Sequence, residues 1–272
     1  MTIRTVVTDL DGTFWTTAIT LHPATVDAVA ALDAADVGLV IATGRRAQGA
    51  LVGLRSMELS DRHGIFMNGA LVRKRLDGPS FHVDPIPTAD ALKTIELFGH
   101  VGLEPLLYVD HPELDMVATP NAAAGDKFIA SAPGVRRVDE ITPIIENSEV
   151  TGFGAFGYPR SLLDELAAEI HQSGCASAIV SGSLFEGDHG IMVQGRNVDK
   201  ATGLAHMETE GMLDLDSTAA VGDGHNDLGM LRAAALAIVP SNAAPEVREV
   251  ADVLIPPNEE GGWEQIPSII GL

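Results

Sequence analysis

Short apolar runs alternate with helical patterns at both ends of this chain. The runs are continuous and rich in β-branched residues, which is typical of strands that are buried on both faces. They cover residues 5–8, 39–42, 64–67, 219–222, 236–239 and 253–255. Apolar residues recur at helical spacing over residues 24–36, 226–234 and 244–251. Strands that alternate with helices predict an α/β fold with a Rossmann-like parallel sheet at its core.

The middle of the chain has a different pattern. Asp77-Gly78 separates two strand-like segments, 71–73 and 81–83, and predicts a hairpin. Helices are then expected at 89–99 and 160–173, a strand at 106–109 and a loop region over 119–134, and the segment 190–193 closes this region before Gly195. We therefore predict that residues 1–83 and 195–272 form the α/β core and that residues 84–194 form an inserted α+β domain.

Composition and charge exclude several classes of protein. The chain has 272 residues, enough for one large domain or two ordinary ones, and carries 38 acidic against 17 basic residues, a formal charge of −21. This charge repels nucleic acid and anionic lipid, so neither is expected as a partner. A phosphorylated small molecule would need a local cation to hold it.

Membrane insertion and secretion are not expected either. No apolar run approaches the roughly 20 residues that cross a bilayer, and residues 1–4 lead into the first predicted strand without the layout of a signal peptide. We therefore expect a cytoplasmic protein. The single cysteine, Cys175, excludes an intrachain disulfide and a multi-cysteine zinc or iron–sulfur site.

Polar residues gather where the predicted strands end, which is where ligands bind in an open parallel sheet. The segments that follow these strands are Asp9-Leu10-Asp11-Gly12-Thr13, Thr43-Gly44-Arg45, Asn68-Gly69 and Asp223-Gly224-His225-Asn226-Asp227. Carboxylates placed together repel one another unless a divalent cation bridges them, and oxygen ligands without a Cys or His cluster favour Mg²⁺ over zinc. The sequence therefore predicts a magnesium site beside glycines and a threonine hydroxyl that can approach an anion.

Lys200 lies at the predicted start of a helix, in the segment Asp199-Lys200-Ala201-Thr202. A cation at this position opposes the helix dipole and therefore has no structural reason to be there. An ammonium group suits a phosphoryl oxygen and the carboxylate cluster, so we interpret Lys200 as functional.

Together these residues resemble the four ordered motifs of the haloacid dehalogenase (HAD) superfamily of phosphotransferases. The matching segments are 9–13, 43–45, Lys200 and 222–227. Three further segments, 67–70, 241–247 and 258–262, resemble the Cof-like sugar-phosphatase branch of that superfamily. The chain departs from the pattern at Phe14-Trp15, where aliphatic residues are usual, and at Pro240-Ser241, where Met-Gly is more usual. The resemblance implies a HAD-like core, with the inserted domain acting as a cap that sets substrate specificity.

The resemblance also implies an activity, that of a Mg²⁺-dependent phosphatase for small phosphorylated metabolites such as sugar phosphates. It makes Asp9 the nucleophile that forms an aspartyl-phosphate, and Asp11 the group that protonates the leaving alcohol and then deprotonates water. Mg²⁺ would be held by Asp9, by the backbone carbonyl of Asp11 and by Asp223. Thr43 and Lys200 would bind the non-bridging phosphoryl oxygens.

Six further residues are expected around this centre: Gly44, Arg45, Asn68, Asn226, Asp227 and Asn242. Asp227 would orient Lys200 or a metal-bound water, and Asn226 would shape its loop. The other two asparagines either reach the edge of the site or are ordinary loop and helix-cap residues. Arg45 either assists phosphate binding or lies at the surface. His225 is assigned no role.

Four alternative functions compete with this interpretation. A signalling receiver domain also uses acidic residues, a Thr and a Lys at strand ends, but it is about half this length and has no inserted domain. A phosphomutase of the same superfamily and a phosphatase for a cofactor phosphate such as pyridoxal phosphate both stay open. An inactive binding protein is disfavoured because Asp9, Asp11, Lys200 and Asp223 are all present. The substrate, the oligomeric state and the exchange of Mg²⁺ for Mn²⁺ or Co²⁺ are left undetermined.

Overall fold

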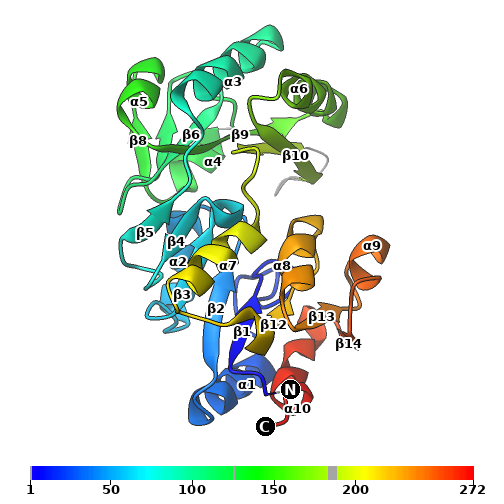
Figure 1. Ribbon diagram of the computed structural model, residues 1–272. Helices are drawn as coiled ribbons and strands as arrows, with labels where there is room; N and C mark the ends of the chain where they lie inside the picture. The colour runs from blue at the N-terminus through cyan, green and yellow to red at the C-terminus, as the bar shows by residue number, and fades with distance from the viewer. Residues whose placement is uncertain (1, 125, 183–188) are drawn as a thin grey trace. The chain divides into compact units, whose positions relative to one another are not determined.

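The computed structural model describes residues 2–124, 126–182 and 189–272. The chain forms two compact units (Figure 1). The core unit comprises Met1–Arg45, Leu51–His82 and Asp199–Leu272, and the inserted unit comprises Arg46–Ala50 and Val83–Val198. No helix within the described ranges is both long enough and apolar enough to cross a membrane.

The core unit is built on an eight-stranded sheet with the strand order β14-β13-β12-β1-β2-β3-β4-β5. The strands are β1 (Thr5–Thr8), β2 (Gly38–Ala42), β3 (His63–Phe66), β4 (Leu71–Arg73), β5 (Ser80–Val83), β12 (Thr218–Val221), β13 (Leu236–Pro240) and β14 (Val253–Ile255). Neighbouring strands from β14 to β3 are parallel, and β4 runs antiparallel to β3. The predicted α/β fold with a parallel-sheet core is confirmed, and the segments of the predicted hairpin extend the sheet beyond β3.

Both faces of this sheet are covered. Val6 and Val7 are neighbours in β1 and point to opposite faces, and both are 0% exposed. One face packs against α7 and α8 through residues such as Leu204 and Leu231, while α1 contacts β2 and the C-terminal helix α10. The helices are α1 (Pro23–Ala34), α2 (Ala47–Ser56), α7 (Lys200–Thr209), α8 (Leu228–Ala233), α9 (Pro245–Arg248) and α10 (Ile266–Ile269).

The inserted unit has an α+β fold of its own. Its six-stranded sheet has the order β10-β11-β9-β6-β7-β8, in which β7 and β8 are parallel and the other neighbouring pairs are antiparallel. The strands are β6 (Leu106–Val109), β7 (Met116–Ala118), β8 (Val135–Arg137), β9 (Val150–Tyr158), β10 (Ser177–Gly182) and β11 (His189–Gln194), and the helices are α3 (Thr88–His100), α4 (Asp126–Ser131), α5 (Thr142–Asn147) and α6 (Arg160–Ser173). A core that includes Phe98, Phe153 and Leu163 joins the sheet to α3 and α6.

Two parts of the inserted unit differ from the sequence-based expectation. The region 119–134, expected to be a loop, contains the helix α4. The long central strand β9 was not predicted, because its glycines interrupt the apolar run. The structure shows why a glycine stands at position 154: a Cβ there would lie 2.6 Å from the hydroxyl of Tyr108.

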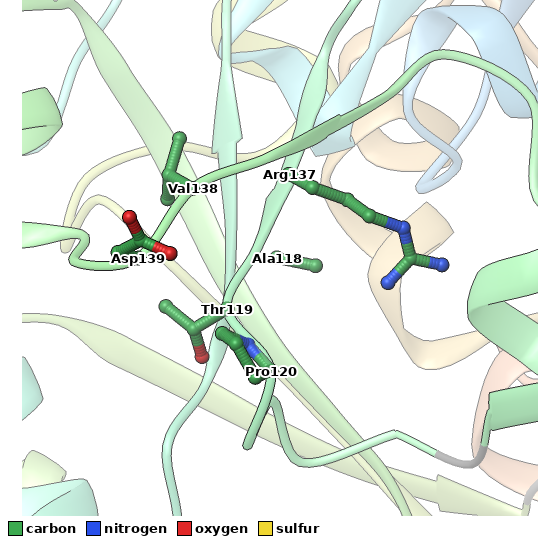
Figure 2. Close-up of a pocket in the computed structure, with 6 residues that line it drawn as sticks. All are labelled: Ala118, Thr119, Pro120, Arg137, Val138 and Asp139. Atoms are coloured by element: carbon green, nitrogen blue, oxygen red, sulfur yellow. The ribbon is translucent and has the colours of Figure 1, made fainter.

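The inserted unit also contains a cavity of about 270 Å³ where β7 and β8 end (Figure 2). It is lined by Ala118, Thr119, Pro120, Arg137, Val138 and Asp139. The Thr119 hydroxyl is buried and has no hydrogen-bond partner among the described residues. None of the site residues predicted from the sequence lines this cavity.

Candidate active site

The connections of the core sheet reverse direction at β1, because β2 lies on one side of it and β12 on the other. Such a switch point leaves a crevice at the carboxyl ends of the strands, where ligands bind in open α/β sheets. Asp9 follows β1, Thr43 follows β2 and Asp223 follows β12 by two residues. The topology therefore brings the three predicted segments to one edge of the sheet.

Lys200 is the first residue of α7 and is 0% exposed. Its Nζ donates a hydrogen bond to Oδ1 of Asp9 and another, of 2.5 Å, to Oδ1 of Asp227. The start of α7 is fixed independently by a capping box, in which Asp199 accepts a hydrogen bond from the Thr202 backbone and the Thr202 side chain accepts one in return. The dipole of α7 disfavours a positive charge at the start of the helix. The carboxylates of Asp9 and Asp227 therefore stabilise the charged form of Lys200.

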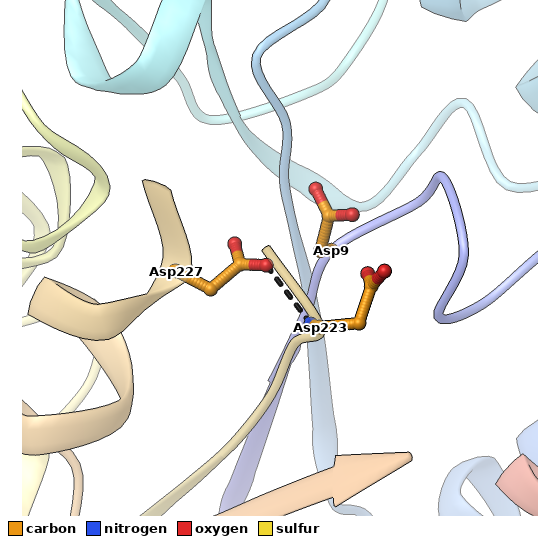
Figure 3. A group of neighbouring side chains, drawn as sticks. All are labelled: Asp9, Asp223 and Asp227. Carbon is orange, nitrogen blue, oxygen red and sulfur yellow. Dashed lines mark hydrogen bonds between the residues drawn. The ribbon is translucent and has the colours of Figure 1, made fainter. Parts of the chain in front are cut away.

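Asp227 shapes the loop that carries Asp223. Its Oδ2 accepts the backbone N–H of Asp223 at 3.0 Å (Figure 3). The same oxygen accepts the backbone N–H of Gly224 at 2.8 Å. Gly222 permits this approach, because a Cβ at that position would lie 2.6 Å from Cγ of Asp227. Both oxygens of Asp227 are therefore engaged, one by Lys200 and one by the loop.

Asp223 is held from the other side by the segment after β1. The hydroxyl of Thr13 donates a 2.6 Å hydrogen bond to Oδ1 of Asp223. Gly12 has a φ of +76°, in the left-handed region, and a Cβ there would overlap the Asp223 carboxylate. A glycine at position 12 is needed for both its backbone conformation and its lack of a side chain.

Three carboxylates come together here, those of Asp9, Asp223 and Asp227 (Figure 3). Each offers one oxygen, and these three oxygens lie within 4.8 Å of one another. Burial raises the pKa of Asp9 well above its usual value. The charges of Asp227 and Asp223 add to this rise, and Lys200 opposes it. Burial also raises the pKa of Asp223 to about 6. Although burial opposes it, the charges of Asp227 and Asp9 raise the pKa of Lys200. Three carboxylates around one ammonium leave this cluster short of positive charge.

A divalent cation fits this deficit and this set of oxygen donors. Because both oxygens of Asp227 are engaged, the side chains of Asp9 and Asp223 are its candidate carboxylate ligands. Oδ2 of Asp9 accepts no hydrogen bond from the part of the chain that the structure describes. The carboxylate of Asp11 is engaged by Arg45 and Trp15, which leaves its backbone carbonyl as the oxygen that Asp11 offers to a cation.

The Asp11 carboxylate accepts three hydrogen bonds. Arg45 donates from Nε to Oδ2 and from Nη2 to Oδ1, both at 2.6 Å, and Nε1 of Trp15 donates to Oδ1 at 3.0 Å. The Arg45 guanidinium also stands 5.0 Å from the centroid of the Trp15 ring. Partial burial by itself would raise the pKa of Asp11. The hydrogen bonds and charge of Arg45, with the hydrogen bond from Trp15, outweigh burial, so the pKa of Asp11 is lowered. From the sequence, the role of Arg45 is open and Trp15 is only a departure from the family pattern, so neither contact with Asp11 is predicted.

The remaining predicted residues border these groups. The buried hydroxyl of Thr43 accepts the backbone N–H of Arg45 at 3.1 Å. Nδ2 of Asn226 donates to Oδ1 of Asn68 at 3.0 Å, and a Cβ at Gly44 would lie 2.9 Å from that Asn68 oxygen. These contacts join the loops that follow β2, β3 and β12.

Asn242 reaches the segment after β1 instead. Its Nδ2 donates to the backbone carbonyl of Gly12 at 3.0 Å. Ala244 is the N-cap of α9, so Asn242 is not a helix cap. The structure thus ties Asn242 to the loop that holds Asp223.

Comparisons with known proteins cover nearly the whole chain. Residues 6–265 match the family model of haloacid dehalogenase-like hydrolases. A protein of Streptococcus pyogenes serotype M6 that carries a provisional phosphatase name is 27% identical over 271 residues, which cover 96% of each chain. A pyridoxal phosphate phosphatase of Escherichia coli K12 is 26% identical over 274 residues, which cover 95% of each chain.

The fold has solved counterparts as well. The structure of a sugar phosphatase of HAD subclass IIB matches with a TM-score of 0.76 and 21% identity, and the match covers 98% of this chain and 99% of that one. At this identity the likeness concerns the fold.

Proposed function

Because the chain belongs to the haloacid dehalogenase-like hydrolases and is a phosphatase of that family, we propose that it is a Mg²⁺-dependent enzyme that hydrolyses small phosphomonoesters, sugar phosphates above all, through phosphorylated Asp9. The observation that carries this proposal is the position of Asp9. Its carboxylate lies at the switch point of the sheet, with Lys200 on one oxygen and the other oxygen without a hydrogen bond from the described residues.

In the first step, Oδ2 of Asp9 attacks the phosphorus atom. A new O–P bond forms while the bond between phosphorus and the leaving oxygen breaks, and Asp11 gives that oxygen a proton so that it departs as an alcohol. Because the pairing with Arg45 lowers the pKa of Asp11, Asp11 carries this proton only after Arg45 has left it. Lys200 holds Oδ1, which leaves Oδ2 to attack, and its charge opposes the rise in the pKa of Asp9 that burial causes.

In the second step, Asp11 acts as a base. Its carboxylate takes a proton from water as the water oxygen attacks phosphorus, and the O–P bond to Asp9 breaks. Inorganic phosphate leaves, the Asp9 carboxylate is restored and Asp11 again carries a proton.

Several groups of this chain would stabilise the negative charge of the phosphoryl group. Thr43 and Lys200 bind the non-bridging oxygens, where charge is greatest in the transition state. Mg²⁺ held by Asp9, Asp223 and the Asp11 carbonyl would offset the repulsion between the phosphate and the carboxylates. Asp227 acts indirectly, because it holds both Lys200 and the loop of Asp223.

Two substrate classes have support. The resemblance to the Cof-like branch and the fold shared with a sugar phosphatase favour sugar phosphates. The E. coli relative, which this chain matches over nearly its full length, is a pyridoxal phosphate phosphatase. This match favours a cofactor phosphate as the second candidate substrate.

Phosphate release from a panel of sugar phosphates and pyridoxal phosphate, with Mg²⁺ and with a chelator, tests the proposal. We expect release with Mg²⁺, strong loss with the chelator and no release by Asp9→Asn. Omitting any bisphosphorylated sugar separates a phosphatase from a phosphomutase, because a mutase would need that activator. Absence of phosphate release from every compound, or full activity after exhaustive chelation, would contradict the proposal.

A further inference from the structure

Trp15 contacts both Asp11 and Arg45, yet no step above uses it. Its indole N–H donates to Oδ1 of Asp11 at 3.0 Å, and its ring faces the Arg45 guanidinium at 5.0 Å. Aliphatic residues are usual at this position in the superfamily that the sequence resembles, so these contacts belong to this chain's own side chain.

The Trp15 side chain is held firmly. It is 1% exposed, and its backbone carbonyl accepts a 2.7 Å hydrogen bond from Nδ2 of Asn258. One edge of the ring lies on α2 at Gly53, where a Cβ would lie 2.8 Å from Cζ3 of the indole. The backbone N–H groups of Phe14 and Trp15 both bond the Leu10 carbonyl, which turns the chain so that Trp15 meets Asp11.

The two partners of Asp11 differ in their freedom to move. The Trp15 indole is enclosed, whereas the Arg45 side chain is 26% exposed and that of Asp11 is 52% exposed. Arg45 occupies Oδ2 and shares Oδ1 with Trp15, so each oxygen of Asp11 is engaged. Asp11 can exchange a proton with a substrate only when one of these oxygens is released, and a phosphoryl anion is a competing bidentate partner for the guanidinium.

We propose that Trp15 is the positioning residue of Asp11. Its N–H keeps hold of Oδ1 while Arg45 turns from Asp11 toward the phosphoryl group. Oδ2 is thereby presented to the leaving oxygen and later to water. The ring face keeps Arg45 beside Asp11 before the substrate arrives. This inference rests on the proposed function, since it assigns a position to the acid and base of that reaction.

Two substitutions separate the two contacts. Trp15→Phe keeps an aromatic ring and removes the N–H, and Trp15→Leu removes both. Trp263→Phe is the matched control, because Trp263 is also buried and its Nε1 donates a 3.1 Å hydrogen bond to the Thr8 hydroxyl, while its ring meets that of Phe14 edge-on. Among the described residues, its indole makes no hydrogen bond to Asp11 and no ring contact with Arg45. Thermal unfolding of all three reports the loss of packing.

The first readout is how the rate depends on the leaving group. Trp15→Phe should lower kcat for alkyl phosphates about 10- to 100-fold, the scale of one lost hydrogen bond to a charged group. With an activated aryl phosphate, the rapid first turnover should stay within about threefold of the original protein, because its leaving group needs little acid assistance. The second step still needs its base, so phosphorylated protein should accumulate. Trp15→Leu should in addition raise KM.

The second readout does not depend on activity. The chain has two tryptophans, so the indole region of a ¹H–¹⁵N spectrum should hold two signals, which Trp15→Phe and Trp263→Phe assign. In Asp11→Ala, the Trp15 signal should move and the Trp263 signal should not.

The outcomes separate the inference from the proposed function. If Trp15→Phe slows alkyl and aryl phosphates equally without accumulating phosphorylated protein, as Trp263→Phe is expected to do, Trp15 is a packing residue and the inference is wrong. An unmoved Trp15 signal in Asp11→Ala would also overturn it. If the original protein releases no phosphate from any ester, the proposed function fails, and the spectra still test the hydrogen bond.

Discussion

Lys200 and Asp227 are joined by a 2.5 Å hydrogen bond, and the second oxygen of Asp227 holds the backbone of the loop that carries Asp223. One carboxylate therefore fixes both the cation beside Asp9 and a candidate metal ligand. Lys200 bonds Asp9 as well, so the three side chains form one buried network.

Removing the cation of this network should be costly. Lys200→Met leaves Asp9 and Asp227 buried without their counter-charge, and we expect the free energy of unfolding at pH 7 to fall by about 3–5 kcal/mol. Urea unfolding measures this loss. Lys93→Met is the control, because Lys93 is 42% exposed and its ion pair with the exposed Glu96 is screened by water, so its loss should leave stability nearly unchanged.

A second substitution tests whether charge is the reason. Adding Asp227→Asn to Lys200→Met removes one of the two uncompensated carboxylates. The double variant should regain part of the lost stability but no phosphatase activity. A Lys200→Met protein as stable as the original would contradict the network.

The pKa of Asp223 predicts a pH dependence in metal-free protein. The folded value of about 6 lies above the ordinary value of 3.8. Between these two values the folded protein holds a proton that the unfolded chain has released, so the free energy of unfolding decreases as pH rises through this window. The decrease attributable to Asp223 is at most about 3 kcal/mol, and it is complete above pH 6.

A divalent cation binds the deprotonated carboxylate and should reverse this loss. Mg²⁺ should therefore stabilise the protein at pH 7 and do so much less near pH 4.5, as measured by urea unfolding with Mg²⁺ or with a chelator. Asp223→Asn should raise metal-free stability at pH 7 and abolish the response to Mg²⁺, whereas Asp216→Asn, at an exposed carboxylate, should do neither. The same Mg²⁺ response in both variants would exclude Asp223 as a ligand.

Gly12→Ala tests the close approach of the β1 segment to Asp223. A Cβ in a left-handed conformation costs about 1–2 kcal/mol by itself, and here it would also displace the Asp223 carboxylate. We expect both lower stability and at least a tenfold loss of apparent Mg²⁺ affinity in activity titrations.

Gly102→Ala is its matched control. Gly102 has a φ of +73°, close to the +76° of Gly12, but no atom lies within 4 Å of its added Cβ. This variant should lose only the conformational cost and keep its Mg²⁺ affinity. Equal Mg²⁺ affinities in the two variants would show that the approach of Gly12 to Asp223 does not matter for the metal.

The predictable parts of this molecule are those with a local signal. The parallel strands are continuous apolar runs, and polar residues at their ends meet because carboxyl ends of parallel strands share an edge. The strand β9 has no such run, because glycines at 152, 154 and 157 replace the side chains that would mark it. The hydrogen bond between Trp15 and Asp11 could not be predicted from the sequence either. It depends on the turn at Leu10 and on the space that Gly53 leaves for the indole ring.

In the proposed mechanism, Asp9 carries the phosphoryl group and Asp11 moves the protons. The most direct test is the intact mass of Asp9→Asn and Asp11→Asn after rapid acid quenching during turnover of an activated aryl phosphate. Asp9→Asn should gain no phosphoryl group. Asp11→Asn should accumulate one on the peptide that contains Asp9, because it lacks the base for the second step, and its steady-state rate should fall about 10²–10⁴-fold. A phosphorylated Asp9→Asn protein, together with normal turnover by Asp11→Asn, would contradict the account and exchange the roles of the two carboxylates.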